Sequence, residues 1–485
     1  MMLPDPGGPL VSDVVLAGGR PGPTRVPGFT VRRADPADGA GEGSDLAAYR
    51  RLRRAVFVSE QGLFTGSDHD DVDDDPRTIV LVARTPDGEV LGGVRVAPSH
   101  HPAMPTSSRD LGWWTGSRLV VAPGSRLLLG VGAALVRAAC AEVESRGALR
   151  FDALVQAPNE GLFRRLGWTS RALVHAHGRP HVEMTWPIDR AARLAHDTKS
   201  ALGELLLGVS TGAPAGFVGD DGAPVPGSDL IAACDAILPS MVERDPTWAG
   251  WCAVLVNLND LHAMGARPVG ILDAVAARDA SFARRILAGL AEAAAAYGVP
   301  VLGGHTQLGV PAALSVTALG RTSTPVPGGG ARPGETLRLT ADLGGDWRPG
   351  YTGTQWDSTT RRRSPELRAL AAVVPTLAPT AAKDVSMAGI IGTVGMLAEA
   401  SGVRAELDVA AVPTPSAASA GDWLTCFPGF AIVSTETAAG AGTALPGFLT
   451  SAACGRTTAG HGVGLRWPDD VVTEAVDTVT GLGAA

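Results

Sequence analysis

The block 257–266 places a carboxylate and two amides directly after an apolar run, in the sequence Asn-Leu-Asn-Asp-Leu-His-Ala-Met-Gly-Ala. The run 253–256 (Ala-Val-Leu-Val) indicates a buried strand, and the small residues that follow indicate a helix. Asp260 would then lie with Asn257 and Asn259 where a strand turns into a helix, a place where polar side chains can gather around a phosphate or its metal ion. The alternative is an Asn/Asp helix cap. Three other acidic or glycine-rich segments lie at suitable distances along the chain, and they favour the interpretation of this block as part of a binding site.

The composition is typical of a globular protein with several domains. The 485 residues predict about three domains, and 45% apolar against 19% charged residues supply material for their cores. The net charge is −8 without a long Lys/Arg stripe, which argues against nucleic acid as a main partner. No uncharged apolar run reaches ~18 residues and the start lacks a signal pattern, so no membrane partner is expected. The five scattered cysteines never form a CxxC pair, which predicts reduced thiols, a cytoplasmic location and no structural zinc.

Changes in composition divide the chain into a tail and three predicted domains. The tail is 1–28, where Pro and Gly are frequent and periodic apolar positions are few. The domains are predicted at 29–189, 190–328 and 329–485. An amphipathic connecting helix is expected over 190–207, and the Pro/Gly-rich segment 325–334 has the composition of a hinge.

The first domain alternates strand-like and helix-like segments. The runs 78–84 and 90–96 predict adjacent strands joined by the turn 86–88. A third strand is expected at 119–121. The segment 132–144 predicts a helix with one apolar face.

Three segments of this domain carry a resemblance to the GNAT family of acyltransferases. The segment 49–61 resembles the family's first helix, and 117–123 followed by 130–132 resembles the strand, loop and helix that hold coenzyme A. The segment 156–168 resembles the family's N…LF..LGW pattern. Glycines let backbone N–H groups approach a pyrophosphate, and a helix N-terminus favours its charge. The resemblance implies a mixed sheet, acetyl-CoA as the donor and a small-molecule amine as the acceptor.

Individual residues follow from this resemblance. Those implied to contact acetyl-CoA are Val121, Arg126, Gly130, Val131, Gly132, Ala133 and Asn159. Glu60 is a candidate general base, and its alternative is a solvated carboxylate at a helix end. The acidic run 68–75 is interpreted as a solvated loop, of a kind that also suits a cationic amine. His175, His177 and His181 are candidates for the acceptor pocket, and the alternatives are packing at a strand edge or solvent exposure.

Five ordered segments from about residue 200 resemble the superfamily of aminoimidazole ribonucleotide (AIR) synthases, thiamine-monophosphate kinases and selenophosphate synthetases. They are 218–223, 233–235, 257–266, 302–306 and 382–392. In the superfamily these places hold a glycine–aspartate opening, a metal-binding strand, an NLSDLAAMGA block, a GGDT or GGHS turn and a TDVTGFGLLGH block. The resemblance implies two α+β domains, ATP and Mg²⁺ as cofactors, and a homodimer.

The same resemblance implies a set of site residues. Asp221, Asp235, Asp260 and Asp384 would bind metal, and Asp220, His305 and Ser386 would lie near the nucleotide. Hard carboxylate ligands suit Mg²⁺ ions that bridge the oxygens of ATP. Any one of these aspartates, taken alone, would more often be a cap or turn residue.

This sequence differs from the known branches of the superfamily at several positions, and these differences reduce the number of possible functions. Residues 204–218 contain neither the reactive cysteine nor the lysine of selenophosphate synthetases. Thiamine-monophosphate kinases have a histidine after the second metal aspartate, which is absent here, and aspartates where Met387 and His305 stand. The opening signature of AIR synthase itself is also absent. The segment 351–363, with Trp356 and several arginines, is either a closing element over a phosphorylated substrate or an ordinary exposed loop.

The sequence therefore predicts a bifunctional cytoplasmic enzyme of α/β and α+β class. An acetyl-CoA-dependent N-acetyltransferase would be fused to an ATP- and Mg²⁺-dependent enzyme that activates an oxygen of a second small molecule. The alternative is that a catalytically silent nucleotide-binding module regulates or scaffolds the acetyltransferase. The chain as a whole resembles bacterial AIR-synthase-related proteins and N-acetyltransferases associated with nitrogen starvation and nitrilase gene clusters, which suggests nitrogen or nitrile metabolism by association.

Overall fold

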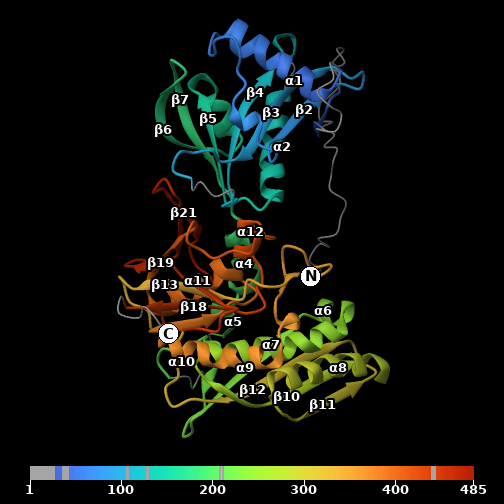
Figure 1. Cartoon of the computed structure of the whole chain (residues 1–485), viewed down its shortest axis with the longest axis vertical. Helices are drawn as coiled ribbons and strands as arrows, with labels where there is room; N and C mark the ends of the chain where they lie inside the picture. The colour runs from blue at the N-terminus through green and yellow to red at the C-terminus, as the bar shows by residue number, and fades with distance from the viewer. Residues whose placement is uncertain are drawn as a thin grey trace. The chain divides into compact units, whose positions relative to one another are not determined.

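The computed structural model describes residues 28–34, 43–104, 109–126, 130–206, 209, 212, 214–437 and 444–485. The chain is divided into two compact units, the N-terminal unit Met1–Ile188 and the C-terminal unit Asp189–Ala485. Figure 1 colours their sheets and helices along the chain. Apart from Gly28, the predicted tail 1–28 lies outside the described residues. None of the described helices is long and apolar enough to pass through a membrane.

A seven-stranded mixed sheet forms the N-terminal unit, in the order β1-β2-β3-β4-β5-β7-β6. The strands are β1 Thr30–Arg33, β2 Ile79–Arg84, β3 Val90–Pro98, β4 Trp113–Val121, β5 Arg150–Gln156, β6 Thr169–Ala176 and β7 Arg179–Trp186. The antiparallel pair β2 and β3 confirms the strands expected at 78–84 and 90–96. Every neighbouring pair is antiparallel except β4 with β5, which run parallel.

The parallel pair β4 and β5 separates before its strands end. Residues 113–116 pair with 150–153, whereas 117–121 of β4 and 154–156 of β5 have no partners in each other. Helix α2, Val131–Ser145, packs against β3 and β4 and confirms the helix expected at 132–144. Its predicted apolar face is buried at Leu135, Val136, Ala139 and Val143. The sheet therefore has a gap between the unpaired ends of β4 and β5, next to a well-packed core.

Two further helices complete the N-terminal unit. Helix α1, Asp45–Arg53, begins where the hydroxyl of Ser44 accepts the N–H of Ala47, and it continues as the π-helical segment Arg54–Glu60. Helix α3 is Glu160–Arg165. The helix expected within 49–61 is therefore present, with a wider last turn.

A five-stranded sheet with two long helices on one face forms the first half of the C-terminal unit, in the order β11-β10-β12-β9-β8. The strands are β8 Ala223–Pro224, β9 Leu230–Ile237, β10 Arg267–Ala277, β11 Val301–Leu308 and β12 Ala313–Arg321. Helices α7, Pro246–Ala263, and α8, Ala280–Tyr297, lie side by side (Figure 1). They approach closely at Gly250 and Gly289, because a Cβ at either position would meet the backbone of the opposite helix.

Helix α7 overturns the strand expected at 253–256. The run and the acidic block after it are both helical, and nearly every residue of α7 is buried. Because all faces of this helix are apolar, its sequence lacks the period that separates a helix from a buried strand. The signals that mark its start are Pro246 at the first position and Asp245, whose carboxylate accepts the N–H of Trp248.

A seven-stranded sheet forms the second half of the C-terminal unit, in the order β16-β18-β13-β19-β17-β20-β21. The strands are β13 Thr336–Ala341, β16 Ala381–Asp384, β17 Arg404–Asp408, β18 Ala431–Glu436, β19 Thr450–Thr458, β20 Val463–Arg466 and β21 Val472–Val476. Helix α11, Gly389–Ser401, packs on this sheet beside α12, Ala420–Thr425, and α4, Arg190–Lys199. The mixed α+β class expected of this region is confirmed.

Three local expectations in the C-terminal unit are corrected. The connecting helix expected at 190–207 is two helices, α4 and α5 Leu202–Leu206, with a break after the C-cap Ser200. The segment 302–306 is not a turn but part of the edge strand β11. Trp356 is buried, and its indole N–H donates to the carbonyl of Gly344 at 2.7 Å, so this part of 351–363 is core and not a closing loop.

Candidate functional site

Three aspartates from separate elements meet in the C-terminal unit. Asp221 lies just before β8, Asp260 lies near the end of α7, and Asp384 ends β16. One carboxylate oxygen from each lies within 4.8 Å of the others. The backbone N–H of Asp384 donates to Asp221 Oδ2 at 2.9 Å, which ties the two halves of the unit together at this point. The structure thus brings together three of the four predicted metal ligands.

The electrostatics of this cluster fit a divalent cation. Burial, followed by the charges of Asp384, Asp235 and Asp221, raises the pKa of Asp260 well above its usual value. Burial and the charges of Asp221 and Asp235 raise the pKa of Asp384 in the same way. No basic side chain within the described ranges forms an ion pair with Asp260 or Asp384. Buried carboxylates left without a counter-charge are the ligand set that hard cations such as Mg²⁺ favour.

Lys383 supplies part of the missing counter-charge. Its ammonium lies 2.7 Å from Asp221 Oδ1 and 2.9 Å from Asp220 Oδ1, and its side chain is 3% exposed. Burial opposes this charge, but attraction from Asp221 and Asp220 raises the pKa of Lys383 above its usual value. Burial raises the pKa of Asp221 to about 6 although Lys383 lowers it. One local pattern indicates this lysine, because it is a charged residue inside the otherwise apolar start of β16.

Asp220 is held by three donors. Its Oδ2 accepts the N–H of Gly328 at 2.7 Å, and its Oδ1 accepts from Lys383 and from the N–H of Asp221. This carboxylate therefore joins residues 220–221, the segment after β12 and strand β16. Its expected place beside the nucleotide stays a prediction.

The two amides of the block 257–266 hold neighbouring backbone. Asn257 Oδ1 accepts the N–H of Asp235 at 3.1 Å, and the amide of Asn259 donates to the carbonyl of Gly429 at 2.8 Å. His262 is buried beside Phe430, and burial lowers its pKa to about 3, which keeps the ring neutral. These side chains fix the end of α7 against both halves of the unit.

The remaining predicted residues lie at different distances from the cluster. Asp235 is on β9 and adds to the negative potential at Asp260 and Asp384. Ser386 follows Asp384 by two positions, and its buried hydroxyl has no hydrogen-bond partner in the described part of the chain. His305 is exposed on β11, and strands β10 and β12 separate β11 from β9. One chain alone does not bring His305 beside Asp235.

In the N-terminal unit, most residues expected to contact a coenzyme line one cavity of about 550 Å³. They are Val121, Arg126, Gly130, Gly132, Ala133 and Asn159. Gly130 precedes α2 with φ +111°, a conformation that favours glycine, so that α2 begins at the cavity. Val131 differs, because it is buried in the core at the first position of α2.

Glu60 lies at the surface in an ion pair. Both of its oxygens accept from Arg126, at 2.7 and 2.8 Å, and both side chains are more than 40% exposed. The hydrogen bonds from Arg126 lower the pKa of Glu60, which weakens it as a base. Glu60 is not among the described residues that line the cavities of this unit.

A second cavity of about 260 Å³ lies where β4 and β5 separate. It shares five lining residues with the first, which are Phe57, Leu119, Gln156, Asn159 and Phe163. His177 and His181, two of the three candidate histidines, also line it, whereas His175 is not among its described lining residues. A ligand bound in the first cavity could therefore reach a second ligand between the strands.

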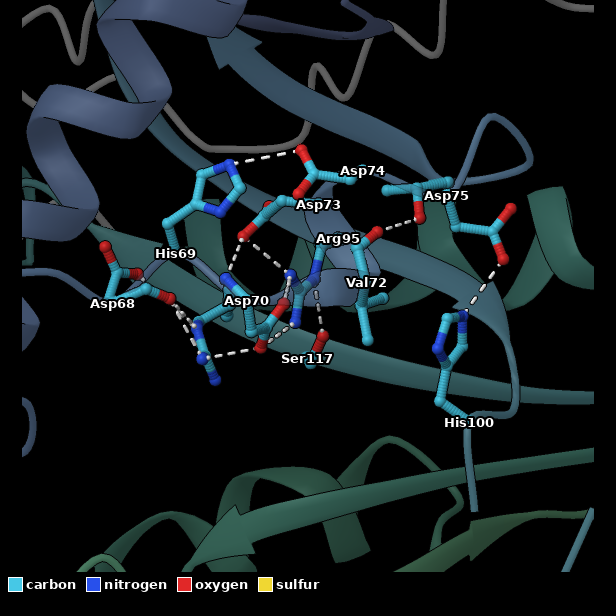
Figure 2. Close-up of polar contacts among 12 residues, drawn as sticks. Asp68, His69, Asp70, Val72, Asp73, Asp74, Asp75, Arg95, His100 and Ser117 are labelled. Carbon is cyan, nitrogen blue, oxygen red and sulfur yellow. Dashed lines mark hydrogen bonds and ion pairs between the residues drawn. The ribbon is translucent and has the colours of Figure 1, made fainter. Parts of the chain in front are cut away.

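Within the acidic run 68–75, Asp68, Asp70 and Asp73 form an ion-pair network, whereas Asp71 and Asp74 are exposed, as a solvated loop predicts. Figure 2 shows Asp70 and Asp73 gathered around Arg95, which also bonds Ser117. Arg53 donates to Asp68 and Asp73, and its side chain is 2% exposed. Burial alone would raise the pKa of Asp73. Hydrogen bonds and charge from Arg53 and Arg95 nevertheless hold this pKa well below its usual range. The arginine partners lie on α1 and β3, so the acidic segment of the sequence does not by itself predict these ion pairs.

Comparison with known families matches the C-terminal unit. Residues 219–322 match the family described as AIR synthase related protein, N-terminal domain, and residues 345–468 match its C-terminal domain. An uncharacterized protein of Synechocystis is 38% identical over 221 residues, which are 44% of this chain and 68% of that protein. A protein of Methanocaldococcus jannaschii is 31% identical over 198 residues, or 39% of this chain and 60% of that protein.

Relatives with named activities match over shorter lengths. A thiamine-monophosphate kinase of Synechococcus elongatus is 34% identical over 30% of this chain and 46% of its own length. A selenide, water dikinase of Myxococcus xanthus is 34% identical over 32% of this chain and 46% of its own length. The chain thus spans about half the length of these two enzymes.

Solved structures include similar chains. The thiamine monophosphate kinase of Aquifex aeolicus covers 52% of this chain and 92% of its own, at 21% identity and a TM-score of 0.40. Phosphoribosylformylglycinamidine synthase II of Thermotoga maritima covers 61% of this chain and 49% of its own, at 17% identity and a TM-score of 0.46.

We predict that Lys383→Met destabilises the C-terminal unit when no divalent metal is present. Removing one partner of a buried ion pair costs about 3–5 kcal/mol, and Mg²⁺ should restore part of this loss by screening the aspartates. Urea unfolding with and without Mg²⁺ measures both effects. Arg321→Met is the matched control, because Arg321 and Asp229 form an exposed pair and its loss should cost less than about 1 kcal/mol. Equal losses in the two variants would contradict the assignment.

Proposed function

Because the chain belongs to the AIR synthase related family through residues 219–322 and 345–468, we propose that its C-terminal unit binds ATP with Mg²⁺ and activates an oxygen of a small molecule. The observation that carries this proposal is the buried cluster of Asp221, Asp260 and Asp384, whose charge is not balanced by the protein. Relatives named as thiamine-monophosphate kinase and selenide, water dikinase support an ATP-dependent reaction.

The three aspartates would hold the metal, and Lys383 would position Asp221. When bound at these aspartates, Mg²⁺ would supply positive charge that offsets the charge of the phosphate groups. Asp221 and Asp384 are already joined by a backbone hydrogen bond, so these two carboxylates need little rearrangement to share an ion. Asn257 and Asn259 keep the end of α7, and with it Asp260, against the same seam.

A second candidate is nucleotide binding without turnover, which would make the C-terminal unit a regulator of the N-terminal one. Met387, 42% exposed, favours this candidate, because its position resembles one where thiamine-monophosphate kinases carry an aspartate. Lys383 favours it also, since an ammonium already occupies one side of Asp221. Both candidates require the metal and nucleotide to bind, and only the first requires hydrolysis or transfer.

We predict that Asp260→Asn removes the stabilisation that Mg²⁺ and ATP give to the wild-type chain. Like charges about 4–5 Å apart repel by roughly 3–4 kcal/mol at an effective dielectric of 20, so the metal-free variant should unfold at a higher temperature than metal-free wild type. Thermal denaturation and isothermal titration calorimetry measure both changes. A purely structural Asp260 would give the opposite sign, with a lower melting temperature.

Turnover separates the two candidates. Wild type should release ADP from ATP when small alcohols, phosphorylated compounds or amines are supplied, and Asp260→Asn should not. Asp229→Asn, at an exposed position, is the control and should behave as wild type. ATP binding without ADP release from wild type under every condition would favour the regulatory candidate.

We infer that the N-terminal unit is an N-acetyltransferase of the GNAT type that uses acetyl-CoA. Support comes from the parallel strands that diverge at 116 and 153, and from the cavity that meets the start of α2. The amine nitrogen would attack the acetyl carbonyl, forming a C–N bond as the C–S bond breaks. The amine proton would pass to a base, and the coenzyme A thiolate that leaves would take up a proton.

His181 is the base that the geometry favours. Its Nδ1 lies 3.0 Å from the carbonyl of Arg179, which can only accept, so Nδ1 carries the hydrogen and Nε2 keeps a lone pair. The ring is 4% exposed and lines the cavity between β4 and β5. Glu60 instead lies in its ion pair with Arg126.

We predict that His181→Gln lowers the turnover number for acetyl transfer by about 10²–10⁴, the range for loss of a general base. Acetyl-CoA affinity, measured by calorimetry, should stay the same. Release of coenzyme A thiol with a panel of small amines reports turnover, and Glu60→Gln is the comparison variant. If Glu60→Gln gave the larger loss, the proton acceptor would be Glu60. If acetyl-CoA gave no binding heat, the acyltransferase proposal would fail.

We propose that the chain forms a homodimer through the exposed edge strand β11 and the adjoining open face of the sheet β11-β10-β12-β9-β8. Every residue of β11 is exposed, and four large apolar side chains of β10 and β11 are at least 39% exposed. They are Leu272, Val301, Leu302 and Leu308. An apolar surface of this kind marks an association site.

We predict that Leu302→Glu, which places a charge in this surface, converts the dimer into a monomer. Light scattering coupled to size exclusion measures the mass. Leu173→Glu is the control, because Leu173 is equally apolar and 68% exposed but lies on β6 of the other unit. A wild-type monomer, or a dimer that survives Leu302→Glu, would rule out this interface.

A further inference from the structure

A β-bulge turns Arg118 out of the regular pattern of β4. Gly93 of β3 faces Val120, and Arg95 faces Ser117, so two residues of β4 stand opposite the single residue Val94. Arg118 is the first of these two and has φ +54°, a left-handed conformation that arginine rarely adopts. The bulge thus stores backbone strain at this residue, and bulges commonly redirect a side chain near a binding site.

Tyr49 holds the bulge in place. Its hydroxyl donates to the carbonyl of Arg118 at 2.8 Å, and the tyrosine is completely buried. A Cβ on Gly93 would lie 2.6 Å from the Tyr49 ring, so glycine is needed there for the ring to pass. The unusual backbone of Arg118 is therefore built into the packing of α1 on the sheet.

The guanidinium of Arg118 is fixed on one side and open on the other. Nε and Nη2 donate to the carbonyl of Asp68 at 3.2 and 3.0 Å, and Nη2 also donates to Asp70 Oδ2 at 2.8 Å. Its Cζ lies 4.4 Å from the centre of the Phe64 ring. Nη1 makes no hydrogen bond within the described part of the chain, and Arg118 lines the cavity between β4 and β5.

The cavity offers positive and neutral polar groups but no carboxylate. Arg118, His177 and His181 line it, and no described lining residue is acidic. Asp68, Asp70 and Asp73 are already matched by Arg53, Arg95 and Arg118. Burial, then the charge of Arg118, lowers the pKa of His177, so its ring is neutral near pH 7. A polycation would find no counter-charge here.

Apart from Ser117, Gln156 and Asn159, the rest of the cavity lining is apolar, and the cavity is large enough for a side chain. Its volume of about 260 Å³ exceeds the roughly 150 Å³ of an apolar cavity that holds benzene. Phe57, Phe64, Phe151 and Trp168 contribute aromatic surface. The remaining volume can take the polar part of a small ligand.

We propose that this cavity binds a small amine that also carries a carboxylate and an apolar side chain, with Arg118 Nη1 as the carboxylate partner. An apolar α-amino acid has this chemistry. The carboxylate would lie at Arg118, the side chain among the aromatic rings, and the amine toward His181 Nε2. The identity of the ligand as an acetyl acceptor rests on the proposed acetyl transfer, whereas the binding of a carboxylate does not.

Binding to the full-length wild-type chain tests the carboxylate directly. The probes are L-phenylalanine, L-phenylalaninamide, which lacks the carboxylate, and the polycation spermidine. One charge-assisted hydrogen bond predicts that the acid binds about 10- to 100-fold more tightly than the amide, and spermidine should bind no better than the amide. Calorimetry measures the three affinities. An amide or polyamine that binds as tightly as the acid would overturn the proposal.

Variants then assign the preference to Arg118. Arg118→Gln should raise the KM for the acid by roughly 10- to 100-fold and leave the KM for the amide unchanged, while Arg118→Lys should restore part of the preference. Arg171→Gln, on β6 and outside the cavity lining, is the control. If Arg118→Gln unfolds the unit, the affinities of wild type for the acid and the amide still test whether the cavity binds a carboxylate. An unchanged preference in a folded Arg118→Gln would overturn the role of Arg118.

Acetyl-CoA binding separates the two proposals. If acetyl-CoA binds but the acid has no advantage over the amide, the carboxylate proposal fails and acetyl transfer stands. If the acid has its advantage but acetyl-CoA does not bind, acetyl transfer fails and the carboxylate proposal stands.

Discussion

The C-terminal unit depends on how it accommodates several buried carboxylates at one seam. Asp220, Asp221 and Asp384 meet Lys383 where the two halves touch, and Asp260 reaches the same place from α7. Burying charge is costly unless a counter-charge and hydrogen bonds accompany it. One lysine balances part of the charge, and the backbone N–H groups of Asp384 and Gly328 help to hold Asp221 and Asp220. The remaining negative charge is the reason why we propose a cation at this seam.

This constraint explains why α7 is buried on every side. The helix must carry Asp260 into the interior between two sheets, and its amides must hold Asp235 and Gly429 while it does so. A surface helix with one polar face would leave the carboxylate in water, where it would hold a metal less firmly. The close contact of α7 with α8 at Gly250 and Gly289 follows from the same burial, because only glycine lets the two backbones approach so far.

Local patterns in the sequence predicted the elements that have one apolar face. The strands β2 and β3 and helix α2 were found where alternation and helical periodicity placed them. The same reasoning gave a strand at 253–256, because a helix that is apolar all round has no period to detect. It also gave a solvated acidic loop at 68–75, because Arg53 and Arg95 lie far along the chain from the aspartates they pair with. Lys383 escaped notice for a similar reason, since its partners Asp220 and Asp221 are 163 and 162 positions away.

The two acidic clusters of this chain show why partners, and not the number of acidic residues, decide function. In the N-terminal unit three aspartates meet three arginines, so the cluster is neutral and leaves a single guanidinium nitrogen for a ligand. In the C-terminal unit four carboxylates meet one ammonium, and burial together with the excess negative charge raises the pKa of Asp260 and Asp384. We therefore propose an anion at the edge of the neutral cluster and a cation at the centre of the charged one. Both outcomes follow from the same electrostatic rule applied to different arrangements of basic side chains.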